Sequence, residues 1–201
     1  MTYSEASVTD ETVDRTPGKR ERLIAAACQL LHERGVEATT IGDIARVADV
    51  PPGNVYYYFK TRDEIIEAVV QFHLQTIRAT LASIEASHRT PKGRLKGLVK
   101  VLAEQGDVIA EHGCPQGSLC SELNKRDAGS DHIAAELIRV PLAWAEDQFR
   151  CMGRRDAYDL AVTLIATYQG TSLLTNTMGD PSLMIRESRR LARWIDSLAA
   201  E

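Results

Sequence analysis

Long apolar runs are missing from this chain of 201 residues, and their absence excludes whole classes of protein. No run approaches the roughly 18 consecutive apolar residues that a membrane-spanning helix needs. Residues 1–14 are polar and acidic and lack the apolar centre of a secretory signal peptide, so we expect a cytoplasmic protein without a membrane partner. With 44% hydrophobic residues, a chain of this size can still bury a substantial core.

Cysteine pairs and catalytic motifs are missing as well. Four cysteines in 201 residues are too few for a disulfide scaffold, and the absence of a Cys-x-x-Cys pair argues against a zinc site. The chain has no glycine-rich phosphate loop, no G-x-S-x-G, no H-E-x-x-H and no paired carboxylates in a plausible cleft. The sequence therefore predicts a protein that is not an enzyme and that needs neither a metal nor a cofactor.

Negative charge is concentrated in one short segment. The formal net charge is −4, and residues 1–14 contain four acidic and no basic residues. Residues 15–201 carry 24 basic and 24 acidic residues and are neutral, but residues 15–60 carry seven basic and five acidic residues, with a basic cluster at 19–22. We expect the acidic segment to be a disordered leader. The net charge of the whole chain therefore does not exclude a nucleic-acid partner.

Helix signals run through the whole chain, and no alternating strand pattern or Asn-Gly hairpin interrupts them. Thr40, Thr61 and Thr90 precede apolar helical patterns as N-caps, and Gly35 and Gly113 are natural stops. These signals predict an all-α fold of about nine helices, three short ones followed by about six mostly longer ones. The expected helices cover residues 17–35, 41–48, 52–58, 62–85, 90–113, 117–125, 130–151, 155–178 and 181–198.

Residues 41–60 have the properties of a helix-turn-helix, a motif that places its second helix in the major groove of DNA. Ala45 and Val50 are suited to the core beneath the turn, while Val55 and Phe59 are suited to anchoring the second helix. The alternative is a packed helical corner with aromatic core residues. The residues expected to contact DNA are Thr40, Gly53, Asn54, Tyr56, Tyr57 and Lys60, with Lys19 and Arg20 in a basic arm.

The stretch LLHERGVEATTIGDIARVADVPPGNVYYYFKTRDEIIEAVV, residues 30–70, resembles the N-terminal domain of the TetR family of transcriptional repressors. The resemblance covers about residues 19–70, and GCPQGSLCSEL at 113–123 resembles a segment found in some subgroups of the family. The marks that carry it are Gly35, Thr39-Thr40-Ile41, Ile44-Ala45, Val50, Gly53, Val55-Tyr56 and Tyr58-Phe59-Lys60.

This resemblance implies a homodimer whose recognition helices enter successive major grooves of a palindromic operator, and a ligand cavity in the C-terminal domain. It also carries Thr40, Asn54, Tyr56, Tyr57 and Lys60 over as DNA contacts. One departure is Pro51-Pro52, where the family often has a polar or basic pair. Since proline side chains donate no hydrogen bond, we expect fewer direct hydrogen bonds to the bases at these positions. DNA shape is then expected to contribute to specificity.

We expect three parts: the acidic leader (1–14), a DNA-binding domain (15–61) and a ligand-binding and dimerisation domain (62–201). The last two helices are expected to form a four-helix bundle in the dimer, although an ordinary intramolecular core is the alternative. The candidate interface residues are Gly170, Leu173, Leu174, Trp194 and Leu198. The candidate cavity residues are His73, Leu102, Leu119, Trp144, Phe149 and Tyr168, with a hydrogen-bonded core role as the alternative for His73.

The expected function is that of a homodimeric repressor that binds operator DNA and is released by a small-molecule effector. A shift of the helix at 62–85 would link the cavity to the DNA-binding domain. A second hypothesis is a regulator that senses thiols or electrophiles through Cys114 and Cys120, for which small buried hydrophobes are the simpler interpretation. The sequence also leaves open a helical protein that only binds a small molecule, or an enzyme with Cys114 as nucleophile.

Overall fold

A computed structural model describes residues 17–126 and 133–198 of the chain, so the expected leader lies outside the described residues. Within these residues the chain forms ten α-helices, one 3₁₀ helix and no strand, which confirms the all-α prediction. The helices are α1 (Lys19–Arg34), α2 (Ile41–Val47), α3 (Pro52–Tyr58), α4 (Arg62–Ser87), α5 (Pro91–Ala103), α6 (Gly106–His112), α7 (Pro115–Arg126), η1 (Ile133–Ala135), α8 (Glu136–Cys151), α9 (Ala157–Met178) and α10 (Ser182–Ser197).

The predicted N-caps set the starts of three helices. Thr40, Thr61 and Thr90 each accept, through the side-chain oxygen, a hydrogen bond from the backbone N–H three residues later, at 3.1–3.2 Å. These bonds satisfy donors that the first helical turn leaves without a partner. At Thr61 the reciprocal bond of a capping box does not form, because the Glu64 carboxylate accepts from the backbone N–H of Lys60 at 2.8 Å instead.

The helix expected over residues 90–113 is divided into α5 and α6. Glycine is a poor helix former, and Gly106 lies against the start of α10. A Cβ atom at Gly106 would stand 3.2 Å from the carbonyl oxygen of Pro181. The break therefore fits a tertiary contact that a helical pattern in the sequence does not reveal. Likewise, the helix expected from residue 130 begins as η1, and residues 130–132 lie outside the described residues.

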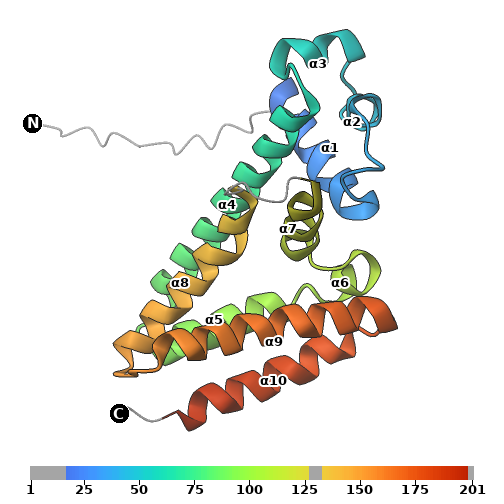
Figure 1. The fold of residues 1–201 in the computed structure, drawn as a ribbon. Coiled ribbons are helices and arrows are strands. Elements are labelled where there is room, and N and C mark those ends of the chain that lie inside the picture. The colour runs from blue at the N-terminus through green and yellow to red at the C-terminus, as the bar shows by residue number, and fades with distance from the viewer. Residues whose placement is uncertain (1–16, 127–132, 199–201) are drawn as a thin grey trace, which may run out of the picture.

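The helices form two connected groups (Figure 1). Helices α1–α3 lie at one end, and the long α4 runs from them to the other end, where α5, α9 and α10 are stacked. Helix α8 packs against both α4 and α9, and α7 lies between α1 and the lower group. Among the described residues, no helix is both long and apolar enough to cross a membrane.

The hydrophobic core beneath α1–α3 continues into the rest of the molecule. Leu23, Val50 and Val55 are buried in this core together with residues from α4. Leu119 and Leu123 of α7 belong to the same cluster. A second cluster joins α4, α5, α8, α9 and α10. The first core therefore ties α1–α3 to the helices that follow them.

Candidate nucleic-acid interface

The turn between α2 and α3 is fixed by its backbone. Asp49 has φ +51°, a left-handed conformation that Asp tolerates better than most residues. The backbone N–H of Val50 then donates to the carbonyl oxygen of Ala45 at 2.9 Å, and the Val50 side chain is buried. Val55 and Phe59 are buried as predicted, so α3 is anchored along its inner face.

The outer face of α3 presents polar and aromatic groups to solvent. Asn54, Tyr56, Tyr57 and Lys60 are all exposed, and Tyr57 is the most exposed large hydrophobic side chain of the described residues, at 79%. Tyr58 is half-buried, and its ring meets that of Tyr57 edge-on at 5.1 Å between centroids. This contact supports the Tyr57 ring from the side of the core and leaves its hydroxyl in solvent.

Gly53 lies at the start of the same face. A Cβ atom built at Gly53 would have no atom within 4 Å, so the protein itself places no restriction on this position. Gly53 is exposed next to Asn54, whose backbone N–H donates to the carbonyl oxygen of Pro51 at 2.8 Å. The open space suits close approach of a duplex to the backbone.

Two of the predicted contact residues hold internal hydrogen bonds. Lys60 Nζ donates to the carbonyl oxygen of Tyr56 at 2.7 Å, near the end of α3. The Thr40 hydroxyl donates to Asp43 Oδ2 at 2.6 Å, and this bond, together with one from Arg46, lowers the pKa of Asp43. Both donors are solvent-exposed, so a phosphate oxygen could take them over without burying an unpaired group.

The basic arm lies against the motif. Lys19 is exposed, and the Arg20 guanidinium carbon lies 5.2 Å from the centroid of the Phe59 ring. Arg22 pairs with Asp49 of the turn, at 3.6 Å between Nη1 and Oδ2. The arm therefore adds positive charge beside α3 rather than on a separate extension.

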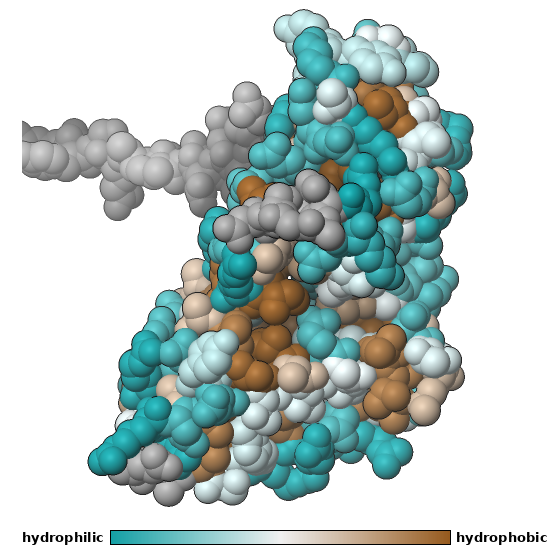
Figure 2. All heavy atoms as spheres, in the orientation of Figure 1, coloured by the Kyte–Doolittle hydropathy of each residue, from teal (hydrophilic) through white to brown (hydrophobic). Residues whose placement is uncertain are grey.

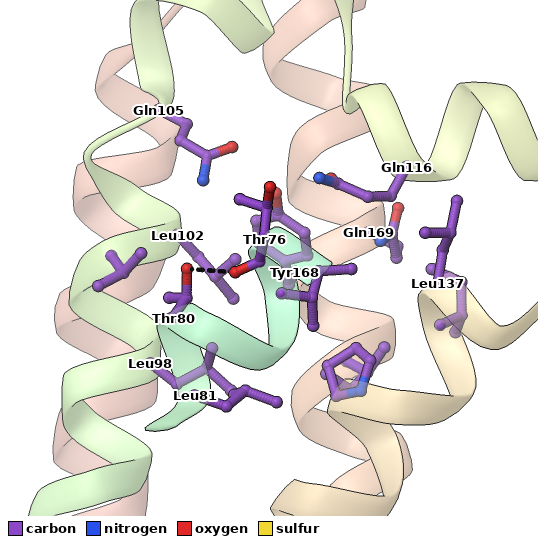
Figure 3. A pocket seen from close by; sticks show the side chains of 15 residues that line it. Thr76, Thr80, Leu81, Leu98, Leu102, Gln105, Gln116, Leu137, Tyr168 and Gln169 are labelled. Atoms are coloured by element: carbon purple, nitrogen blue, oxygen red, sulfur yellow. Dashed lines mark hydrogen bonds between the residues drawn. The ribbon is translucent and has the colours of Figure 1, made fainter. Parts of the chain in front are cut away.

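A cavity of about 110 Å³ lies between α4, α5, α7, α8 and α9 (Figure 3). Of the six residues expected to line it, Leu102 and Tyr168 do so. Burial raises the pKa of the Tyr168 hydroxyl, with a further contribution from the neighbouring Cys114, so this group is neutral.

The other four expected cavity residues lie elsewhere. Leu119 is buried in the core beneath α1–α3. Phe149 is fully buried in the second core, where its ring meets that of Trp194 at 5.9 Å. Trp144 is a partner of Glu85, with its indole N–H donating to the carboxylate at 2.8 Å.

His73 is half-buried on α4, outside the cavity lining. Burial lowers its pKa, and the nearby His32 lowers it further. His32 belongs to α1, and its Nε2 lies 2.8 Å from the carbonyl oxygen of Gly113. The environment of His73 is therefore the junction of α4 with the first group of helices.

Helix α9 leaves an apolar face uncovered. Leu173 and Met178 are each 66% exposed, Leu174 is 50% exposed, and a Cβ atom at Gly170 would meet nothing within 4 Å. Figure 2 shows apolar side chains gathered over the end of α9 near α6. The other two residues expected at an interface, Trp194 and Leu198, pack against the chain's own second core. Met178 was not predicted, although it continues the Gly170–Leu174 spacing.

The cysteines differ in their surroundings. Burial raises the pKa of Cys28 to about 12 and that of Cys120 to about 11, so both are neutral thiols at pH 7. Cys120 donates to the carbonyl oxygen of Ala134 at 2.9 Å. Cys114 is buried before α7, and its sulfur accepts from the backbone N–H of Gly117 at 3.4 Å. These environments are those of packed, hydrogen-bonded side chains.

Helix α7 is bound to the corner between α1 and α2, which the sequence did not reveal. Glu122 Oε2 accepts from the backbone N–H of Val36 at 2.5 Å. It lies close to Gly35, whose φ of +81° favours glycine, and a Cβ atom at that position would stand 2.9 Å from the Glu122 carboxylate. Arg126 pairs with Glu37 at 3.2 Å and with Asp63 at 3.3 Å. Residues far apart in sequence make these contacts, so no local pattern announces them.

Known proteins resemble this chain both in the helix-turn-helix segment and over most of its length. The sequence family described as "Bacterial regulatory proteins, tetR family" matches residues 23–69. The "HTH-type transcriptional repressor DhaR" of Mycobacterium sp. (strain GP1) is 31% identical over 170 residues, which is 79% of this chain and 82% of that protein. A TetR-family regulator from Streptomyces coelicolor superimposes with a TM-score of 0.78 at 17% identity, over 88% of this chain and 93% of that one. A TetR regulator from Legionella pneumophila gives 0.78 at 20% identity, over 90% and 97%.

Proposed function

Since this chain belongs to the TetR family of bacterial regulatory proteins and is a DNA-binding transcriptional regulator, we propose that it acts as a homodimeric repressor that leaves its operator when a small molecule fills the cavity. Operator contacts come from the exposed face of α3, with Tyr57 and Asn54 at its centre and Lys60 at its end. The division into a DNA-binding part (15–61) and a ligand-binding and dimerisation part (62–201) belongs to the same proposal.

One observation carries the release mechanism: the helices that line the cavity also support the DNA-binding helices. Helix α4 lines the cavity with Thr76, Ile77, Thr80 and Leu81, and its first turns are part of the core beneath α1–α3. A ligand that moves the lower part of α4 therefore acts on the position of α3. Because the two recognition helices of a dimer must match the spacing of successive major grooves, about 34–36 Å, a small movement is enough to weaken binding.

Helix α7 offers a second route. Gln116 in its first turn lines the cavity, whereas Glu122 and Arg126 near its end contact the α1–α2 corner. Glu122 lies six positions after Gln116, which is about 9 Å along a helix. Both routes are short, packed and continuous, which supports coupling between the cavity and the DNA-binding surface.

The dimer is supported by the uncovered face of α9. An exposed apolar face of this kind is unusual on a monomer and typical of an interface. Gly170, with open space above it, permits a helix of a second copy to approach closely. With Leu173, Leu174 and Met178 buried against a partner, the two operator-binding surfaces would be related by a two-fold axis.

The proposal is tested by selecting binding sites from a randomised duplex library with the full-length protein. We expect an inverted repeat whose half-sites are centred about 10–10.5 base pairs apart, or a multiple of this, and an affinity that falls steeply as salt rises. Fluorescence anisotropy on the selected duplex at several salt concentrations gives the slope. Recovery of no common sequence, or of a single half-site bound by one protomer, would contradict the dimeric repressor.

Glu122→Gln tests the α7 route. Hydrogen bonds to charged acceptors contribute about 1.5–3 kcal/mol, compared with about 0.5–1.5 for neutral ones, so we expect the free energy of unfolding to fall by about 1 kcal/mol. Exchange of the Val36 amide proton should accelerate at the same time. Glu33→Gln is the matched control, since Glu33 is exposed and, among the described residues, its side chain bonds to Gln29 of its own helix. Unchanged protection of Val36 in the Glu122 variant would show that α7 does not hold the corner.

A further inference from the structure

The lining of the cavity limits the chemistry of its occupant. The fifteen described residues that line it include no Asp, Glu, Lys, Arg or His. A charged group brought into such a site loses its hydration without gaining an opposite charge, and that loss is costly. A charged effector would therefore have no partner here.

The glutamine side chains of the lining lie toward one end of the cavity. Figure 3 shows Gln105, Gln116 and Gln169 at one end of the cavity, while Leu81 and Leu98 lie at the other. A ligand that fills this space would be apolar along most of its length and polar at one end.

The polar end offers groups that are available to a ligand. The side-chain amide of Gln105 has no hydrogen-bond partner within residues 17–126 and 133–198, and it points toward the cavity. The Gln116 carbonyl lies 3.5 Å from the Cys114 sulfur, which leaves its NH₂ group free to donate. By contrast, the Thr80 hydroxyl already donates to the carbonyl oxygen of Thr76 at 2.9 Å. The amides of Gln105 and Gln116 are therefore available to hydrogen-bond a ligand's polar end.

The volume sets the size of the occupant. An engineered apolar cavity of about 150 Å³ takes up benzene, so a cavity of about 110 Å³ suits a molecule of roughly six non-hydrogen atoms. Such a ligand is smaller than a drug-sized molecule or a long acyl chain, for which pockets of about 300–1,000 Å³ are usual.

We infer that the effector is a small, uncharged molecule, apolar along most of its length, with one hydrogen-bonding end held by Gln105 and Gln116. This inference rests on the proposed function in treating the cavity as the effector site. Because Gln116 belongs to the first turn of α7, the ligand's polar end would lie next to this helix. The other end of α7 contacts the α1–α2 corner.

The test compares three probes of equal chain length on the full-length protein, by isothermal titration calorimetry at pH 7 without DNA: pentan-1-ol, pentanoate and pentylammonium. We expect pentan-1-ol to bind at least tenfold more tightly than either charged analogue. Binding of a charged analogue as tightly as the alcohol, or no saturable binding of the alcohol up to 10 mM, would overturn the inference.

Variants locate the site. Leu98→Phe fills the apolar end and should weaken pentan-1-ol binding at least tenfold. If this variant fails to fold, Thr80→Leu fills the cavity from α4 instead and should weaken binding to the same extent. Gln105→Leu combined with Gln116→Leu removes the polar end and should weaken binding about three- to tenfold, the worth of one or two neutral hydrogen bonds. Phe72→Ala, an exposed change outside the cavity, should have no effect. Unaltered affinity in the Leu98 and Thr80 variants would place the alcohol elsewhere.

A separate readout with operator DNA distinguishes this inference from the proposed function. If pentan-1-ol binds in the cavity but never weakens operator binding, the ligand class stands and effector release by cavity filling is wrong. If instead a charged compound releases the operator and Leu98→Phe blocks it, release by cavity filling stands and the ligand class inferred here is wrong.

Discussion

Tyr57→Ala is expected to lower operator affinity about 30-fold or more while leaving the fold and the oligomeric state unchanged. Tyr57 is 79% exposed and makes no contact on which the core depends, so its removal costs little stability. At a protein–DNA interface a lost contact costs about 1–2 kcal/mol, and a dimer loses two of them. Fluorescence anisotropy on the selected duplex measures the affinity, and circular dichroism and sedimentation velocity check the fold and the oligomer.

Two further variants sharpen this result. Tyr57→Phe keeps the ring that Tyr58 supports and removes only the hydroxyl. Comparing its operator affinity with that of Tyr57→Ala separates the contribution of the hydroxyl from that of the ring. Phe72→Ala removes another exposed aromatic ring, on α4 rather than on α3, and should bind operator like the unaltered protein. If Tyr57→Ala binds as well as Phe72→Ala, α3 does not use this residue on DNA.

Leu173→Asp is expected to separate the dimer and, with it, to reduce operator affinity by about 100-fold or more. A carboxylate buried against a partner helix lacks an opposite charge, and two such groups face each other across a two-fold axis. A monomer can occupy only one half-site at a time, so it loses the gain of about 10²–10⁴ that a second linked contact provides. Sedimentation velocity across a concentration series gives the mass, and anisotropy gives the affinity.

The control for Leu173→Asp is the same charge at an exposed apolar position away from α9. Phe72→Asp meets this condition, since Phe72 is 45% exposed on α4. It should remain a dimer and bind operator normally. A dimeric Leu173→Asp protein with full affinity would mean that the uncovered face of α9 is not the interface.

The sequence predicts best where one residue decides a local event. Pro52 starts α3, and Thr40, Thr61 and Thr90 cap the helices that follow them, because these residues act on the nearest turn of backbone. The inner and outer faces of α3 follow from its helical period in the same way. Val55 and Phe59, which were predicted to anchor this helix, are both buried.

The cavity is harder to predict because it depends on packing between distant helices. Phe149 and Leu102 have similar apolar character in the sequence, yet one lies in the second core and the other lines the cavity. The glutamines at its polar end carry no signal of their own, since Gln is common on exposed helix faces. Only the approach of the α5–α6 connection, α7 and α9 brings Gln105, Gln116 and Gln169 together.

The shared core of α1–α3, α4 and α7 has a consequence for how such regulators diversify by recombination. A crossover that replaced only the first sixty residues would set unfamiliar side chains against Leu119 and Leu123 and would place a new corner over Glu122. Packing of this density tolerates mismatched volumes poorly. The unit that can be exchanged intact between relatives therefore consists of α1–α3 together with the surfaces of α4 and α7 that pack against them. Because α4 and α7 also line the cavity, such an exchange would change operator choice and effector response together.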